Sequence, residues 1–217
     1  MLQQGIYDTF YLFSTTERYS KSFNCFPKQC IIDGFDLKFI KELIKAQKKR
    51  IDKYGKESPK VASILLVFDD LLGSIQTGSH EMNYLNMLFS TSRHVNVGLL
   101  VISQSCKGLT SPVIRNNADL IIWRQINDNY LRSLYESVYW SGNFKSFMDF
   151  TKKSFQNTDF QMIAYDNMTT NDDQRWMLLL AEECEFQIEM TPRRIKDTKK
   201  DKSKDDKKIK AKNQKEH

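Results

Sequence analysis

Three short apolar runs lie in the middle of the chain, and each is separated from the next by enough residues to form a helix. The runs are residues 61–68 (VASILLVF), 97–102 (VGLLVI) and 118–123 (ADLIIW). Near-continuous apolar runs of this length are typical of strands buried on both faces, as in parallel sheets. Strands that alternate with helices predict βαβ units with right-handed crossovers. The sequence therefore predicts an α/β fold with a mostly parallel sheet.

The segments on either side of these runs also have clear periodicity. Residues 6–13 (IYDTFYLF) are rich in β-branched and aromatic side chains, which predicts a strand. Asp36 is a good N-cap for an amphipathic helix that Gly55 ends. Further expected elements are helices at 81–92, 127–138 and 144–150 and a hairpin of strands at 159–165 and 175–180.

The positive charge is concentrated at the end of the chain. The 217 residues, enough for one domain, carry 33 Lys and Arg and 27 Asp and Glu, a net charge of +6. Residues 191–217 hold 12 of the basic and 5 of the acidic side chains and no aromatic residue. Such a segment buries too little apolar surface to fold. We expect a nearly neutral domain at 1–190 and a basic disordered tail at 191–217.

Several classes of protein are excluded by simpler features. No apolar run approaches the roughly 20 residues that span a bilayer, so we expect no membrane span. No secretory signal opens the chain, which points to an intracellular protein. The cysteines are Cys25, Cys30, Cys106 and Cys184, with no CxxC pair, which favours reduced structural thiols over a zinc site.

The candidate chemistry begins where the first apolar run ends in two carboxylates, Asp69 and Asp70. In open parallel sheets the carboxyl ends of the strands face the ligand crevice. One carboxylate there can orient a magnesium-bound water and a second can polarise an attacking water. Gln104 follows the next run and is expected at the same edge. The alternative interpretation is a buried strand that ends in a solvated acidic turn, with Gln104 an ordinary surface residue.

Three arginines are expected near this edge or on surfaces that lead from it: Arg93, Arg115 and Arg124. A guanidinium group presents a planar fork of donors suited to phosphate oxygens, and it can act across a subunit boundary as an arginine finger. The alternative for each of them is a salt bridge or a solvated surface position. His94 is interpreted as a packing or capping residue.

Taken together, LLVFDD, SRHVNVGLLVISQS and SPVIRNNADLIIW resemble the genome-packaging ATPases of the FtsK/HerA superfamily, in the branch found in poxviruses, other large DNA viruses and related mobile elements. The resemblance covers roughly residues 6–126. It implies a RecA-like P-loop NTPase domain with three layers, which binds ATP and Mg²⁺. It further implies a homo-oligomeric ring that threads double-stranded DNA into a capsid, with capsid or portal proteins as partners. The expected location is the viral factory in the host cytoplasm, or the virion.

The resemblance also assigns roles to residues. Asp69 is similar to the Walker B aspartate that organises Mg²⁺ through water, and Asp70 to its catalytic acidic neighbour. Gln104 resembles the polar sensor after the fourth strand. Arg93 and Arg115 lie in the arginine-containing motifs, and either of them is a candidate for the trans-acting finger.

One motif of this superfamily, the Walker A loop G-x-x-x-x-G-K-[ST], is absent from the 217 residues. The nearest match, residues 54–58 (YGKES), lacks the first glycine and is interpreted as a turn. Residues 6–13 resemble the second strand of the superfamily's sheet, whose order is 5-1-4-3-2. We therefore expect a domain without its central first strand and P-loop, and two apolar strands with unpaired backbone groups.

Three explanations of the missing loop remain open: a truncated or split chain in which Met1 is internal, a separate polypeptide that supplies the loop, or decay to a nucleotide-free subunit. The first hypothesis for function is an ATP-driven DNA-packaging motor subunit that is inactive alone. The alternatives are a non-catalytic DNA-binding or scaffold subunit, and another P-loop helicase or assembly ATPase.

Overall fold

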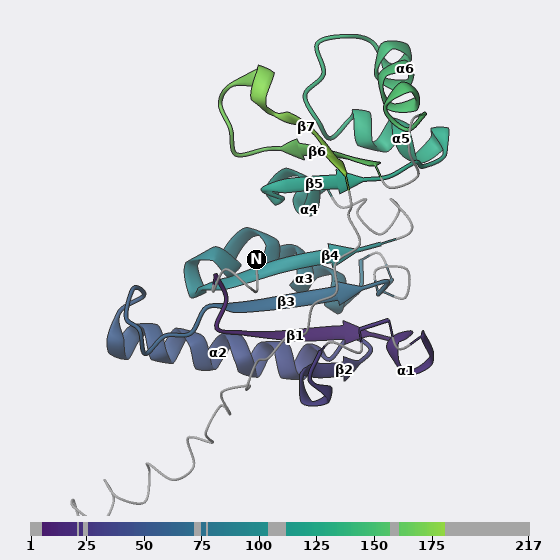
Figure 1. The fold of residues 1–217 in the computed structure, drawn as a ribbon. Helices are drawn as coiled ribbons and strands as arrows, with labels where there is room; N and C mark the ends of the chain where they lie inside the picture. Colours follow the sequence, from purple (N-terminus) through teal and green to yellow (C-terminus); the bar gives the residue numbers. More distant parts are fainter. Residues whose placement is uncertain are drawn as a thin grey trace, which may run out of the picture.

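The computed structural model describes residues 6–20, 22–23, 26–71, 75–76, 78–103, 112–156 and 161–180 of the chain. These residues form two sheets with helices packed against them (Figure 1). The strands are β1 (Thr9–Ser14), β2 (Ile31–Asp33), β3 (Ile64–Asp69), β4 (Val97–Ile102), β5 (Leu120–Trp123), β6 (Gln161–Asp166) and β7 (Trp176–Leu180). The α-helices are α1 (Glu17–Ser20), α2 (Leu37–Tyr54), α3 (His80–Thr91), α4 (Pro112–Asn117), α5 (Asp128–Tyr135) and α6 (Phe144–Ser154). The 3-10 helices are η1 (Lys28–Cys30), η2 (Ser92–Val95) and η3 (Asp172–Gln174).

The first sheet has four strands in the order β2-β1-β3-β4, and every neighbouring pair is parallel. The register places Ser14 of β1 beside Asp69 of β3, and Asp69 beside Ile102 of β4. The strands β1, β3 and β4 therefore end at a common edge. This arrangement confirms the parallel α/β fold that the apolar runs predict.

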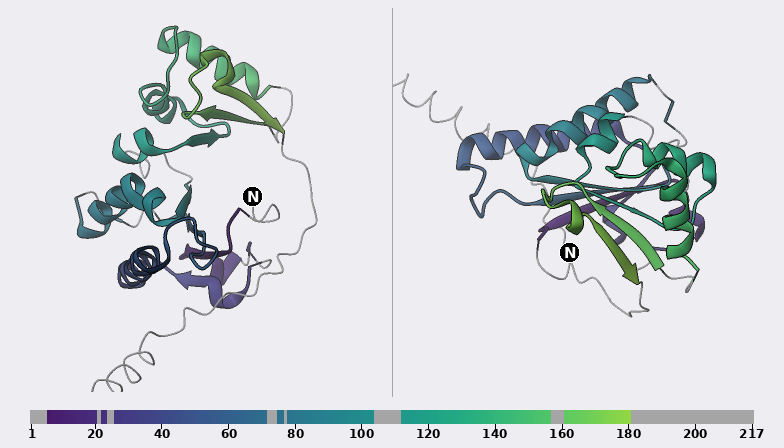
Figure 2. Two further views of the ribbon diagram at one scale, coloured as in Figure 1. Left: turned by 90° about the vertical axis from the view of Figure 1, so that its left-hand side faces the viewer. Right: turned by 90° about the horizontal axis from the view of Figure 1, so that it is seen from above.

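One face of the first sheet is covered by α2 and α3, which lie on the same side of the strands in the left view of Figure 2. The side chains of Ile40 and Leu43 from α2 and of Leu85 and Leu88 from α3 are buried there. The helix α2 begins at its expected cap, because the Asp36 side chain accepts a hydrogen bond from the Phe39 N–H at 2.9 Å. This face holds the main core of the first sheet.

The other face of the first sheet has a smaller core around β1 and β3. Phe10 and Leu12 of β1 are buried there beside Cys30, and the Phe26 ring meets the Phe10 ring edge to face at 4.5 Å. Burial raises the pKa of the Cys30 thiol, which keeps it protonated and unreactive. Cys25, Cys106 and Cys184 lie outside the described residues.

The second sheet is antiparallel, in the order β5-β6-β7, and it confirms the expected hairpin of β6 and β7. Its core is mainly aromatic. Trp123 of β5 lies against Phe147 of α6 and Trp176 of β7, with ring centroids 6.4 and 5.9 Å apart. Tyr165 of β6 is also buried in this cluster, which fixes α5 and α6 on one face of the sheet.

The connection from β4 to the second sheet passes through α4. Ile114 of α4 is buried in the core of the first sheet, and α4 packs against α3. Ala118, which follows α4, already contacts the second sheet, since its carbonyl accepts from the Asn167 side-chain amide at 3.1 Å. Within the described part of the chain, β4 and β5 do not pair with one another. The sheet is thus interrupted at the position that the resemblance gives to the first strand.

Candidate active site

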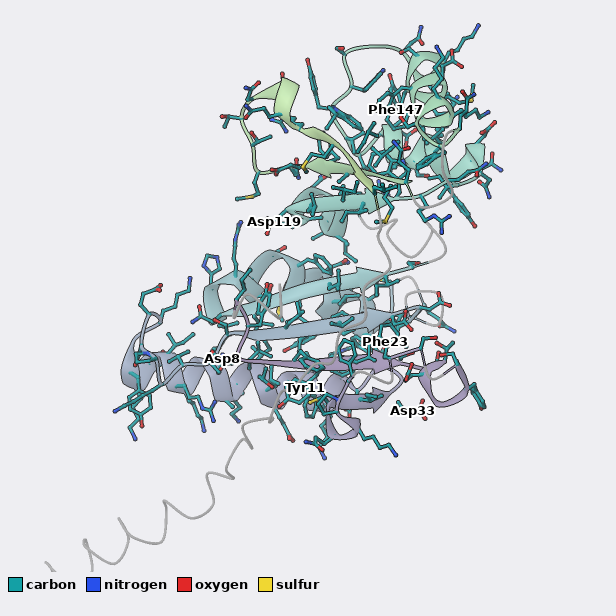
Figure 3. The ribbon with its side chains drawn as sticks, in the orientation of Figure 1. Asp8, Tyr11, Phe23, Asp33, Asp119 and Phe147 are labelled. Atoms are coloured by element: carbon teal, nitrogen blue, oxygen red, sulfur yellow. The ribbon has the colours of Figure 1, made fainter. Side chains whose placement is uncertain are left out.

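The candidate site lies at the edge where the strands of the first sheet end. Figure 3 labels Asp33, the last residue of β2, at this edge and Asp8, which precedes β1, at the opposite one. In a parallel sheet all carboxyl ends point to one side, where ligands of open α/β sheets bind. The pairing of Asp69 with Ser14 and Ile102 brings three strand ends together at this edge.

The Asp69 carboxylate is held by the hydroxyl groups that follow β1. The Ser14 hydroxyl donates to Asp69 Oδ2 at 2.9 Å, and the Thr16 hydroxyl donates to the same oxygen at 3.4 Å. Ser14 Oγ in turn accepts from the N–H groups of Thr16 at 3.3 Å and Glu17 at 3.2 Å. A serine hydroxyl has one proton and two lone pairs. The two N–H groups occupy the lone pairs, so the proton of Ser14 is directed to Asp69.

Asp70 follows at a sharp change in the backbone direction. Its φ angle is +49°, in the left-handed region that Asp and Asn adopt more readily than most residues. Its N–H donates to the Ile102 carbonyl at 2.9 Å, which ties this turn to the end of β4. The next residue, Leu71, is fully buried. The turn therefore holds Asp70 at the edge, and its side chain is half-buried.

A buried carboxylate that the sequence pattern did not indicate lies beside this network. Glu17 is only 6% exposed, and its Oε2 accepts from the Phe23 N–H at 3.0 Å. Because its own N–H donates to Ser14, Glu17 links the segment after β1 to the hydroxyl that contacts Asp69. The spacing Ser14-x-x-Glu17 matches a capping box, which is the signal that could have identified it.

Gln104 lies outside the described residues, which continue after β4 only as far as Ser103. Its expected role in the site therefore stays a prediction. The end of β4 itself is at the predicted edge, because Ile102 pairs with Asp69.

The three arginines lie at different places in the fold. Arg93 is exposed in η2, ahead of the first residue of β4, and six strand residues at about 3.3 Å each separate it from the acidic edge. Arg93 therefore lies at the amino edge of the sheet, away from Asp69 of its own chain, and its expected role as a trans-acting finger stays a prediction. Arg115 is half-buried in α4, and Arg124 follows the end of β5.

The weak Walker A match at residues 54–58 is a helix end and the turn after it. Gly55 adopts a φ of +83° and its N–H donates to the Ile51 carbonyl, which caps α2. The Lys56 carbonyl accepts from the Asn96 side chain at 2.9 Å. Asn96 directly precedes β4, so Lys56 lies at the amino edge of the sheet, away from Asp69. The interpretation of this segment as a turn is confirmed.

The carboxylates suit a magnesium ion that is shared with a phosphate ligand. Mg²⁺ usually keeps several waters and is held by one or two carboxylates together with substrate phosphates. Among the described residues no group of three or more His, Cys, Asp and Glu side chains could form a complete protein cage for a metal. Both hydroxyl contacts reach Oδ2 of Asp69, which leaves Oδ1 for a metal-bound water.

The fold and the acidic edge define the class of protein to which the chain belongs. Its parallel sheet and the Asp pair at the carboxyl end of β3 match the pattern of P-loop NTPases. The model of the family "Poxvirus A32 protein" matches residues 10–198. The chain therefore belongs to this family, whose members are viral genome-packaging ATPases. A comparison with curated proteins finds no match.

Solved structures of the packaging protein B204 from two viruses share the fold. The genome-packaging NTPase B204 from Sulfolobus turreted icosahedral virus 2, in complex with ATP-gammaS, has a TM-score of 0.51 at 19% identity, over 82% of this chain and 83% of that chain. Its complex with sulfate gives 0.53 at 16% identity, over 82% and 83%. The DNA-packaging ATPase B204 from Sulfolobus turreted icosahedral virus gives 0.51 at 15% identity, over 85% and 86%. At these identities the likeness supports the fold. Of the helices that the structure describes, none is long and apolar enough to cross a bilayer.

Proposed function

We propose that this chain carries the acidic half of an ATP-hydrolysis site whose turnover drives double-stranded DNA into a viral capsid. The observation that carries the proposal is the pair Asp69 and Asp70 at the carboxyl edge, with Asp69 held by the Ser14 hydroxyl at 2.9 Å. The matching family and the nucleotide-bound B204 structures support nucleotide as the ligand.

In this proposal the two carboxylates have different tasks. Asp69 would hold Mg²⁺ through a metal-bound water at Oδ1, since Ser14 and Thr16 already engage Oδ2. Such an ion would supply positive charge to the phosphates of the nucleotide. Asp70 accepts a proton from the attacking water, and its constrained turn holds the carboxylate at the edge. Gln104 is proposed to position that water from the end of β4.

The exposed Arg93 is proposed to act on a neighbouring subunit of a ring. It lies at the opposite end of β4 from its own Asp69, so it is far from the site of its own chain. A finger supplied in trans requires this kind of exposed position. Arg115, half-buried in α4, is the second candidate for the finger. We propose the capsid or portal as the partner of the ring, and the viral factory or virion as its location.

A non-catalytic DNA-binding or scaffold subunit is the second candidate function. The observation in its favour is that the sequence of 217 residues contains no G-x-x-x-x-G-K-[ST] motif. Without such a loop, the chain alone has no cradle for the phosphates. The proposed ATPase therefore depends on a phosphate-binding loop from outside residues 1–217.

The test uses the chain extended at its N-terminus by the polypeptide encoded in frame directly ahead of Met1, here called the extended chain. A G-x-x-x-x-G-K-[ST] motif in that extension supports the ATPase, and a stop codon without such a motif contradicts an ATPase whose loop belongs to the same chain. In the extended chain, Asp70→Asn is expected to reduce ATP turnover by about 10²-fold or more, the usual contribution of a general base. Asp128→Asn, an exposed carboxylate in a surface pair with Lys152, is the matched control and leaves turnover unchanged. Equal turnover by the wild-type and Asp70→Asn extended chains contradicts the role of Asp70.

A further inference from the structure

The helix α2 and the turn after it carry much of the positive charge of residues 1–190. Residues 38–60 hold 9 Lys and Arg and 3 Asp and Glu, a net charge of +6. The rest of residues 1–190 holds 12 Lys and Arg and 19 Asp and Glu, a net charge of −7. The near neutrality of residues 1–190 therefore conceals two opposite charges, and the positive one is concentrated on a single helix and its turn.

The helical period places the lysines on the solvent side of α2. The buried residues of this helix are Ile40, Leu43, Ile44 and Gln47. At 3.6 residues per turn, five exposed lysines fall on the opposite side: Lys38, Lys41, Lys45, Lys48 and Lys49. We call these five residues the α2 lysine face, and Figure 3 shows nitrogen-tipped side chains along this helix. Glu42 is the one acidic residue between Lys38 and Lys49, so residues 38–49 keep a clear excess of positive charge.

The neighbouring helix α3 contacts one lysine of this face. Lys41 Nζ lies 5.2 Å from the centre of the Tyr84 ring on α3. Glu81, at the start of α3, has a lowered pKa; the hydrogen bonds from its own backbone and from Ser79 are the main causes, and Lys41 contributes. Lys41 is therefore engaged with α3. The other four lysines carry most of the charge that this face presents to a partner.

The composition of the α2 lysine face distinguishes between two classes of partner. Interfaces between proteins are enriched in aromatic residues and depleted of Lys, and their binding energy centres on buried aromatic or Arg anchors. Among the described residues of α2, the one exposed large apolar side chain is Tyr54, in the last turn. Lys53 Nζ and Lys60 Nζ each lie 5.1 Å from the centre of its ring. A face rich in lysine and without an apolar centre fits a polyanion better than a protein surface.

The length of the α2 lysine face suits the backbone of a nucleic-acid duplex. At 1.5 Å per residue, Lys38 to Lys49 cover about 17 Å of the helix. Double-stranded DNA carries about one negative charge per 1.7 Å of its axis, so roughly ten phosphates lie along that length. Lys38, Lys41 and Lys45 line one hollow of the surface together. A lysine ammonium is a point charge on a flexible stem, which binds phosphates without a fixed geometry and without reading the bases.

We propose that the α2 lysine face binds the phosphate backbone of double-stranded DNA, without sequence preference. The contact needs no nucleotide, because it depends on the charges of α2 and not on the acidic edge after β3. As part of the path of DNA through a packaging motor, this assignment rests on the proposed function. As a phosphate-binding surface, it rests on the exposed lysines of α2 alone.

Fluorescence anisotropy with a double-stranded oligonucleotide and no nucleotide tests this surface in the 217-residue chain. The α2 triple variant combines Lys38→Gln, Lys45→Gln and Lys48→Gln. It is expected to bind DNA about tenfold or more weakly at ~0.1 M salt. The slope of log affinity against log salt is expected to flatten by about 0.9 for each phosphate contact that is lost. Glutamine favours helix about as well as lysine and the three positions are exposed, so the thermal midpoint is expected to stay unchanged.

Three exposed lysines of α6 provide a control of equal charge: Lys145, Lys152 and Lys153. Replacing all three with Gln removes the same net charge from a different helix, and the basic tail is present in both variants. The α6 triple variant is expected to change DNA affinity by less than about threefold, since salt screens charges that lie far from the bound DNA. Equal losses in the two triple variants overturn the proposal, because net charge alone then explains the binding.

Two further outcomes separate this surface from other functions. Wild-type DNA affinity in the α2 triple variant overturns the proposal. If that variant instead loses self-association, measured by light scattering, the face is a protein interface. Weaker DNA binding by the α2 triple variant, with equal ATP turnover by the wild-type and Asp70→Asn extended chains, keeps the DNA surface and contradicts only the proposed function.

Discussion

Ser14 Oγ donates its proton to Asp69 Oδ2 at 2.9 Å, although 55 residues separate the two in the sequence. The contact exists because β1 and β3 are parallel neighbours in register and end together. Ser14 is only 2% exposed, and its lone pairs accept the N–H groups of Thr16 and Glu17. One buried hydroxyl therefore organises both the turn after β1 and the orientation of the carboxylate.

The first prediction concerns this hydroxyl. Ser14→Ala leaves two N–H donors without their acceptor, and it is expected to lower the free energy of unfolding by about 1–3 kcal/mol. Urea denaturation measures the change. Thr16→Ala, which removes only the longer contact of 3.4 Å at an exposed residue, is expected to cost less than about 0.5 kcal/mol. Equal losses in the free energy of unfolding of the two variants contradict the conclusion that the Ser14 hydroxyl organises the turn after β1.

The second prediction separates the backbone role of Asp70 from its chemistry. At φ +49°, alanine is expected to cost about 1 kcal/mol or more of folding stability, whereas asparagine tolerates this conformation. Asp70→Ala therefore lowers the thermal midpoint and Asp70→Asn leaves it nearly unchanged. Thermal unfolding of the two variants checks this. A midpoint that falls equally in both shows that the carboxylate itself stabilises the turn.

The third prediction concerns pH. The pKa of Glu81 is lowered from 4.5 by its own backbone N–H and then by the Ser79 hydroxyl, at the start of α3. A carboxylate with a lowered pKa in the folded state stabilises the fold above its unfolded pKa, and this contribution is lost as the pH falls through the folded value. Glu81→Gln is expected to reduce the fall in stability as the pH drops from 5 to 3. Denaturation curves at pH 5 and pH 3 measure this loss of stability. If Glu81→Gln and the wild-type chain lose the same stability between the two pH values, Glu81 does not contribute in this way.

The fourth prediction concerns the basic tail. Residues 191–217 carry 12 basic and 5 acidic side chains, while the rest of the chain is nearly neutral. Lysines on such a segment bind phosphates without sequence preference. Deleting residues 191–217 is expected to flatten the dependence of log affinity on log salt by about 0.9 for each DNA phosphate that the tail neutralises. Fluorescence anisotropy with a double-stranded oligonucleotide at several salt concentrations measures the slope. An unchanged slope places the DNA contacts in the domain itself.

The elements with strong periodicity could be predicted from the sequence. The apolar run 97–102 forms β4 with the expected bounds, and the helix after Asp36 ends at Tyr54, directly before Gly55 as expected. The sequence pattern did not indicate β2 or α4. With three and six residues, they are too short to show a period, and β1 and α3 hold them in place.

The candidate site could be predicted only in part. The Asp69 and Asp70 pair was readable because it ends an apolar run. The partner Ser14 was not, because strand register depends on packing that no local pattern records. The position of Arg93 follows from the direction of β4. A residue ahead of a parallel strand lies at the amino edge, opposite to the carboxyl edge where Asp69 lies.

The most direct test of the account is Mg²⁺-dependent ATP turnover by the 217-residue chain itself, measured beside the extended chain. The account predicts no turnover by the 217-residue chain, because its acidic edge has no phosphate-binding loop. It predicts clear turnover by the extended chain, which Asp70→Asn reduces by about 10²-fold or more. Turnover by the 217-residue chain alone, at the rate of the extended chain, would contradict the account.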